Sequence, residues 1–342
     1  MLSSLEYPYK SPPAEGDWLE VASGIFWLRL PLPLALNHVH AWVLRDGDGW
    51  FVIDSGFGGK RMQALWDKII AEKLDGKPIT RLLVTHFHPD HVGSAGYLWQ
   101  KFQPQLLMTK IEWLTARMLA LDIGYSVRDV AAAHYRAMGV ADDMTAQLTG
   151  GNRYAAAVTL PPPTLTPIKN GDTLSIDGDR WQIITGGGHS PEQVSLYSPA
   201  RDIYISADQI LPRISPNVSV WATNPAEDAL AQYLAALDDT RTRVPDSAFV
   251  LPSHDLPFRN LHARIDQLKH HHDERLEQIL DLSRARPHTV AEITTEAFSR
   301  PLDSIQMGFA IGEMLAHANY LQNLGKLRRD IDADGVWKFT TI

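Results

Sequence analysis

The sequence contains no cysteine among its 342 residues. This excludes disulfides, thiolate metal sites, iron–sulfur clusters and cysteine nucleophiles, so any metal site has to use histidine and carboxylate ligands. No apolar run approaches the ~18 residues that a transmembrane helix needs, and the N-terminal segment lacks the basic and apolar regions of a secretory signal. The formal net charge is -8, which argues against a general binder of polyanions. We expect a cytoplasmic protein with no membrane partner.

The amino-acid composition is typical of a globular protein, with 44% hydrophobic and 21% charged residues. The length suggests one large and one small domain, or two medium ones. Short segments rich in aromatic and branched residues, separated by turn signals, predict strands over 18–53. A helical pattern over 58–74, a strand through "ITRLLVT" and a helix through "VGSAGYLWQKF" follow. This order predicts a layered α/β domain.

Two stretches depart from this pattern. Residues 110–165 begin with two or three predicted helices and end in a proline-rich loop, so we interpret them as a helical insertion that either covers a site or only packs. From residue 261 onward, three predicted helices precede a hairpin with Asp334-Gly335 in its turn, which is the order of a winged helix. We therefore predict two domains, 1–260 and 261–342.

The predicted winged helix carries little positive charge. Acidic side chains slightly outnumber basic ones after residue 260. The predicted recognition helix near 311–325 has almost no basic side chains. A DNA-reading helix would show a basic stripe there. We interpret this domain as a packing, lid or dimerisation module, and we do not expect nucleic-acid binding. The run His270–His272 lies on a predicted helix, where its members point in different directions, and we interpret it as a solvated face.

The strongest chemical signal is the segment "LLVTHFHPDHVGSAG" over 82–96, in which an apolar strand ends in four candidate metal ligands. The four are His86, His88, Asp90 and His91. His86 and His88 are two positions apart, so at a strand end they point to the same side and can share one metal. Asp90 and His91 lie just beyond and can face a second metal. Imidazole and carboxylate ligands without thiolate suit Zn²⁺, Fe²⁺ or Mn²⁺.

Three further candidates follow other predicted strands. His189 comes after "ITGGG", Asp208 after "YISA", and His254 after "FVLPS". In each case a strand delivers a ligand to an edge of the sheet, which is where a layered α/β protein can build a site.

With these motifs in this order, residues 18–260 resemble the metallo-β-lactamase fold superfamily. The resemblance implies an αββα sandwich with two metal sites that share a bridging carboxylate. It implies His86, His88 and His189 for the first metal, Asp90, His91 and His254 for the second, and Asp208 as the bridge. It also implies that Asp54, in "FVIDSG", supports a ligating imidazole from behind, and we place Thr85 in the same supporting role. We expect two divalent ions, zinc before iron or manganese.

The resemblance also implies a mechanism. Two metals ~3.5–4 Å apart can share a water and lower its pKa toward 7. The bridging hydroxide would attack a carbonyl carbon or a phosphorus, and Asp90 could both ligate and relay the proton of the nucleophile. No nucleophilic side chain is then needed, which fits a chain without cysteine and without a G-x-S-x-G motif.

The C-terminal part resembles the glyoxalase-II-like branch of β-lactamase-like proteins that carry a winged helix. We therefore predict a dinuclear metallohydrolase acting on a small ester, thioester or lactone, with a small molecule as its partner and a homodimer left open. The alternatives are a phosphodiesterase or ribonuclease with the same metals, a mononuclear iron oxygenase, and a regulatory winged-helix protein. The complete ligand set argues against the last two.

Five residues outside the ligand set are candidate substrate contacts, each with packing or a plain loop role as the alternative. They are His38 in a predicted strand, Tyr125 and Tyr135 in the insertion, and Arg213 and Asn217 shortly after Asp208.

Overall fold

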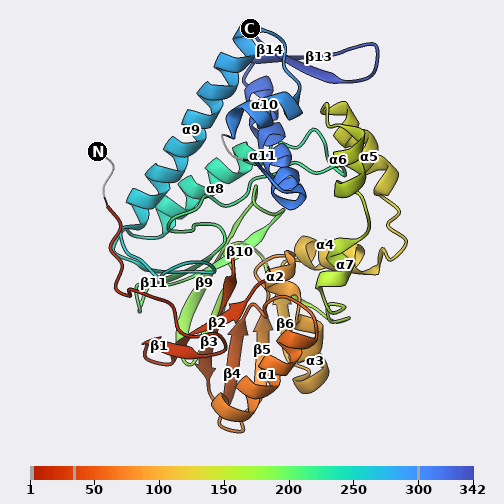
Figure 1. The fold of residues 1–342 in the computed structure, drawn as a ribbon. Helices are drawn as coiled ribbons and strands as arrows, with labels where there is room; N and C mark the ends of the chain where they lie inside the picture. Colours follow the sequence, from red (N-terminus) through yellow and green to blue (C-terminus); the bar gives the residue numbers. More distant parts are fainter. Residues whose placement is uncertain (1–3, 34–35, 299–300) are drawn as a thin grey trace.

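The computed structural model describes residues 4–33, 36–298 and 301–342. Two sheets face each other, helices cover the outer face of each sheet, and a further helical unit with a hairpin lies at one end of the molecule (Figure 1). The predicted fold class, an αββα sandwich of mixed α/β type, is confirmed.

The first sheet has seven strands in the order β1-β2-β3-β4-β5-β6-β7. They span Trp18–Ala22, Ile25–Pro31, His38–Asp46, Gly49–Ile53, Ile79–Leu83, Gln105–Met108 and Thr166–Pro167. Strands β1 to β4 pair antiparallel, whereas β4 to β7 pair in parallel. The parallel strands are linked by α1 (Lys60–Lys73), α2 (Pro89–Val92) and α3 (Ala95–Phe102). The carboxyl ends of β4 and β5 therefore meet at one edge.

The second sheet has five strands in the order β12-β11-β10-β9-β8. In chain order, β8 to β12 span Thr173–Ile176, Asp179–Gly186, Gln193–Ser198, Ile203–Ala207 and Phe249–Pro252. Helix α8 (Ala229–Arg243) connects β11 to β12, which pair in parallel. Because β10 runs antiparallel to both of its neighbours, the carboxyl ends of β9, β11 and β12 lie at the same edge of this sheet.

Alternation of side chains explains the layers. Along β2, Ile25 and Trp27 join the cluster between the sheets, while Phe26 and Leu28 join the cluster beneath α1 and α3. Successive side chains of a strand point to opposite faces, so a strand buried on both sides reads as a continuous apolar run.

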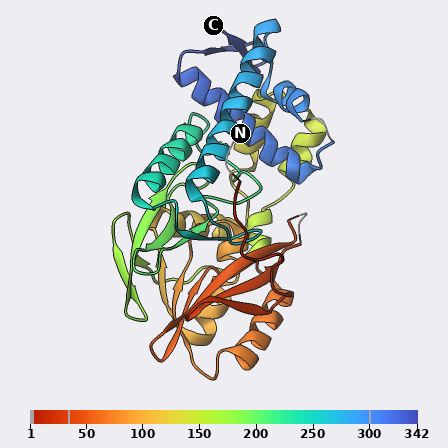
Figure 2. The ribbon, with the colours of Figure 1, turned by 90° about the vertical axis from the view of Figure 1, so that its left-hand side faces the viewer.

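The insertion between β6 and β7 contains four helices. They are α4 (Lys110–Leu121), α5 (Arg128–Ala137), α6 (Asp142–Leu148) and α7 (Arg153–Ala157). The C-terminal unit contains α9 (Leu261–Ala285), α10 (Val290–Ala297), α11 (Ser304–Asn323), β13 (Leu327–Ile331) and β14 (Trp337–Thr341). Helices α5 and α6 lie beside this unit in both views (Figures 1 and 2), and the Ala291 N–H donates to the Met138 carbonyl at 3.0 Å. The two halves of the insertion therefore contact different parts of the molecule.

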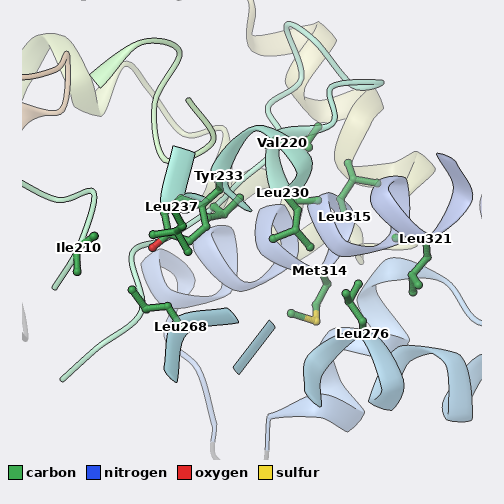
Figure 3. Packing of buried hydrophobic residues seen from close by; sticks show 14 of the residues in the cluster. Ile210, Val220, Leu230, Tyr233, Leu237, Leu268, Leu276, Met314, Leu315 and Leu321 are labelled. Carbon is green, nitrogen blue, oxygen red and sulfur yellow. The ribbon is translucent and has the colours of Figure 1, made fainter. Parts of the chain in front are cut away.

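One hydrophobic cluster joins the second sheet to the C-terminal helices. Leu230, Tyr233 and Leu237 of α8 meet Met314 and Leu315 of α11 in this cluster (Figure 3). The C-terminal unit is therefore packed onto the sandwich through an apolar contact. No helix of the described residues combines the length and apolar character needed to cross a bilayer.

The prediction of a solvated face at His270–His272 is wrong for His272. Its side chain is buried, and its Nδ1 lies 3.0 Å from His317 Nε2 on α11. His317 Nδ1 donates in turn to the Glu313 carbonyl at 2.7 Å. The physical reason is helical phase: position 272 falls on the same face of α9 as the buried Leu268 and Leu276.

This imidazole pair predicts a pH dependence of stability. Burial lowers the pKa of His317 to about 4 and, together with the neighbouring His317, that of His272 to about 2. In the unfolded chain both titrate near 6.5. Below that pH the two histidines bind protons in the unfolded state but not in the folded state, so the free energy of unfolding falls as the pH falls. From pH 7 to pH 5 we expect a loss of about 2 kcal/mol per histidine in denaturant unfolding.

The matched control is the double variant His272→Leu/His317→Leu, which removes both partners and leaves Arg275, His271 and Glu313 in place. Its free energy of unfolding should depend less steeply on pH than that of the unaltered protein. Equal pH dependence in the two proteins would contradict the assignment.

Candidate metal centre

The metal-ligand candidates from the sequence lie at one edge of the sandwich, where strands of both sheets end. His86 and His88 follow β5, Asp90 and His91 belong to α2, and His189, Asp208 and His254 follow β9, β11 and β12. Two backbone hydrogen bonds join the sheets here, from Val194 N to Thr85 O at 2.9 Å and from His40 N to Ser253 O at 2.7 Å. The ligands are thus carried by a framework that connects both sheets.

The first group consists of three imidazoles. His86 Nε2 lies 2.9 Å from His88 Nδ1 and 3.3 Å from His189 Nε2. Two nitrogens bound to one tetrahedral Zn²⁺ at about 2.0–2.1 Å would be roughly 3.3 Å apart. The spacing of the three nitrogens therefore suits ligation of a single ion.

The second group consists of Asp90, His91 and His254. Asp90 Oδ2 lies 3.6 Å from His91 Nε2 and 3.4 Å from His254 Nε2. Asp208 lies between the groups, because its Oδ2 is 3.5 Å from the Nε2 atoms of His91, His189 and His254 alike. Asp208 is therefore within reach of members of both groups.

Two buried atoms of this constellation have no hydrogen-bond partner among the described residues. They are His91 Nε2 and Asp208 Oδ1. Buried polar atoms in folded proteins are nearly always paired, and an orphan calls for an explanation such as an ion. Together with the all-imidazole and carboxylate donor set, these orphans show that the residues fit a divalent metal.

Four histidines direct Nε2 toward the centre of the site, and the Nδ1 atom of each donates a hydrogen bond to another protein group. His91 Nδ1 donates to Asp54 Oδ2 at 2.8 Å, and His86 Nδ1 donates to Thr85 Oγ1 at 3.0 Å. His189 Nδ1 donates to the Asn217 carbonyl, and His254 Nδ1 to the His38 carbonyl, both at 2.8 Å. Such partners fix the tautomer, so that the Nε2 lone pair faces the metal.

Asp54 is the centre of this supporting layer. It accepts from Thr85 N at 2.8 Å and from Thr85 Oγ1 at 2.9 Å, in addition to His91. Its backbone has φ 63, a left-handed conformation that aspartate tolerates better than most residues. The turn after β4 therefore aims the carboxylate back under the ligands.

Burial and charge favour the ligating protonation state at His86, His88 and Asp90, whereas the carboxylates of Asp208 and Asp90 outweigh burial and raise the pKa of His91 and His254 above the ordinary value. Burial and the neighbouring imidazoles lower the pKa of His88 to about 3 and that of His86 well below its ordinary value, which keeps both neutral. Burial alone would raise the pKa of Asp90, but His91 and His254 outweigh it and lower that pKa to about 2. Neutral imidazole and ionised carboxylate are the forms that ligate metals.

Tight local packing explains two features of the ligand loops. Gly188, in the glycine run before His189, has φ 97, and a Cβ there would come within 2.5 Å of Tyr233 Cβ on α8. Ala207, directly before Asp208, has φ 47, which is costly for alanine. The backbone is thus bent at the points where it turns a ligand inward.

The five candidate substrate contacts fall in different places. His38 supports His254 through its carbonyl, and its Nε2 accepts from Asp255 N at 3.0 Å. Arg213 pairs with Asp255 at 3.2 Å and remains half-exposed. Asn217 contributes its carbonyl to His189, while its own side-chain oxygen is buried without a partner.

Tyr125 and Tyr135 lie in the insertion, and Tyr135 packs against the hydrophobic cluster of the C-terminal helices. No hydrogen bond or ring contact found among the described residues joins either tyrosine to a ligand candidate.

Glu112 on α4 was missed by the sequence analysis. It is fully buried and accepts hydrogen bonds from both ligand-bearing loops, at Phe87 N and at Ser190 Oγ. A signal was available, because Glu112 shares a helix face with Ala116 and Leu119, so helical phase places a charged residue on the buried side.

Comparison with known proteins agrees with this fold. The model of the metallo-beta-lactamase superfamily matches residues 34–282, and that of the metallo-beta-lactamase-like C-terminal domain matches residues 276–342. A crystal structure of a beta-lactamase domain protein from Burkholderia ambifaria has a TM-score of 0.92 and 38% sequence identity, covering 99% of this chain and 98% of that one.

A metallo-beta-lactamase family protein from Thermus thermophilus shares the fold, with a TM-score of 0.81 and 23% identity over 94% of this chain and all of that one (100%). A linear primary-alkylsulfatase from a Pseudomonas species is 27% identical over 225 residues, which is 61% of this chain. The chain spans only 40% of the length of that curated relative.

Proposed function

The chain belongs to the metallo-beta-lactamase superfamily, and we propose that it hydrolyses a small ester, thioester or lactone with the help of two divalent metal ions, zinc first among them. One observation carries the proposal: Asp208 Oδ2 lies at 3.5 Å from imidazoles of both ligand groups. A carboxylate in that position can serve two cations at once. When bound, such cations activate water and polarise a substrate oxygen by Lewis acidity.

The residues of the chain then have distinct tasks. His86, His88 and His189 hold one ion, Asp90, His91 and His254 hold the other, and Asp208 serves both. Asp54 and Thr85 keep the imidazoles oriented. Asp90 has a further task in this proposal, because its side chain is 20% exposed whereas that of Asp208 is 8% exposed. Asp90 can therefore accept a proton from the attacking water and pass it to the leaving group.

A second candidate substrate is a sulfate ester, which the resemblance to the linear primary-alkylsulfatase supports. A phosphodiester remains the alternative with the same metals. The net charge of -8 weighs against a polyanionic substrate.

A hydrolysis screen tests the proposal. Zinc-loaded protein is offered chromogenic esters, thioesters and lactones, together with a linear primary alkyl sulfate (octyl sulfate, followed by sulfate release) and bis(p-nitrophenyl) phosphate. We expect the largest kcat/KM on a carboxylic ester, thioester or lactone, and loss of that activity in His86→Ala. Turnover of the sulfate alone would establish the second candidate, and turnover of the phosphodiester alone would reverse the ranking. No metal-dependent hydrolysis of any of these classes would contradict the proposal.

A further inference from the structure

Phe87 lies between His86 and His88, and both of its backbone polar groups form hydrogen bonds with the helical insertion. Its N–H donates to Glu112 Oε2 at 2.9 Å. Its carbonyl accepts from the Tyr154 hydroxyl of α7 at 2.6 Å. Both polar groups of the link between two candidate ligands are thus bound by residues outside the two sheets.

The same carboxylate also holds the loop that carries His189. Glu112 Oε1 accepts from Ser190 Oγ and from Glu192 N, both at 2.7 Å. Thr109, at the start of α4, adds a contact from its hydroxyl to the Glu192 carbonyl at 3.2 Å. Glu112 therefore spans two chain segments that are about a hundred residues apart in sequence and that supply the three-histidine group.

The hydrogen bonds of Glu112 require both of its side-chain oxygens to act as acceptors. Three donors converge on it, and within the described chain no lysine or arginine forms an ion pair with it. A glutamine has the same shape but only one acceptor oxygen, so its amide would place a donor against one of these donors. The carboxylate is therefore specifically required to hold both loops together.

Among the ligand-bearing segments of the described chain, helices α4 and α7 form such bonds only to the loops of the three-histidine group, whereas Thr159, later in the insertion, donates to the Gly93 carbonyl at the end of α2 at 2.7 Å. Among the hydrogen bonds of the described residues, Asp90, His91 and His254 are supported by Asp54 and His38 and by one another, not by α4 or α7. A disturbance of Glu112 should consequently be felt first by His88 and His189.

We propose that Glu112 is a positioning residue that fixes the three-histidine group, and that α4 and α7 thereby act as a clamp on one of the two metals. The inference rests on the metal centre of the proposed function and deepens it. It gives the insertion a defined role, because the helices that border the site also set the geometry of His86, His88 and His189.

Glu112→Gln tests this role by metal affinity rather than by activity. Binding of each ion is measured by competition with a chromophoric chelator, and the ligand geometry by the visible absorption of the Co²⁺-loaded protein. We expect one of the two ions to bind about 10–100-fold more weakly and its Co²⁺ band to change, while the other ion keeps its affinity. Lys110→Gln, an exposed substitution on the same helix, is the control and should change neither.

Two milder variants cover the case in which Glu112→Gln fails to fold. Ser190→Ala and Tyr154→Phe each remove one hydroxyl of the clamp and should weaken the same ion severalfold. Equal weakening of both ions, or no weakening in any of the three variants, would overturn the inference. If the unaltered protein binds no metal at all, the proposed function fails instead, and the two failures are distinguishable.

Discussion

Asp208→Asn is expected to lower kcat by about 10²–10³-fold and to reduce the metal content of the purified protein from two ions per chain to one or none. The Oδ2 atom of Asp208 lies 3.5 Å from the Nε2 atoms of three histidines, which together come from both ligand groups. Asparagine keeps the shape but removes the negative charge, so two cations would lose the anion between them. Metal analysis and steady-state kinetics on the best substrate of the screen measure the two effects.

Asp238→Asn on α8 is a matched control, because it makes the same chemical change at an exposed surface position. It should leave the activity and the metal content unchanged. If Asp208→Asn retained two ions and at least a tenth of the activity, the shared-carboxylate arrangement would be wrong.

Asp54→Ala is expected to have the second largest effect, acting on both stability and metal affinity. The substitution removes the acceptor of His91 Nδ1 and of both Thr85 groups, all of which are buried. Each buried donor left unpaired costs ~1–3 kcal/mol, so we expect the free energy of unfolding to fall by about 3 kcal/mol. Loss of a partner behind a ligating histidine typically weakens metal binding by about 10–100-fold.

Denaturant unfolding in the presence of a chelator isolates the stability effect, and metal titration of the folded variant measures the affinity. Asp54→Asn is the informative comparison, since asparagine also tolerates the φ of 63 and keeps one acceptor oxygen. Its losses should lie between those of the unaltered protein and those of Asp54→Ala. An alanine variant as stable and as tightly metal-binding as the original would contradict the role of Asp54.

The ligand candidates could be proposed from the sequence because their signal is local. "HFHPDH" directly follows an apolar strand, and His189, Asp208 and His254 each follow another. Strand ends of a layered α/β fold converge on a shared edge, so residues far apart in sequence become neighbours once the fold class is known.

The partners that orient the ligands could not be proposed in the same way. The carbonyls of His38 and Asn217 hold His254 and His189, but every residue has a carbonyl, so residue identity carries no signal. Substrate contacts by the side chains of His38 and Asn217 stay a prediction from the sequence, and the structure adds the role of their backbone carbonyls in holding the imidazoles. His272 was misjudged for a related reason, because the helical phase that buries it counts only once a neighbouring helix covers that face.

The sequence by itself determined the donor chemistry of this protein. A chain without cysteine that ends several strands in histidine or aspartate can offer only nitrogen and oxygen ligands, and it presents them at one edge. The bridging place of Asp208 was already implied by the family resemblance, and only the tertiary structure decided that Glu112, from a separate helical insertion, joins the loops of His88 and His189. The reason is physical. A hydrogen bond needs its two atoms roughly 3 Å apart, and for residues far apart in the sequence only the packing of the folded chain sets that distance.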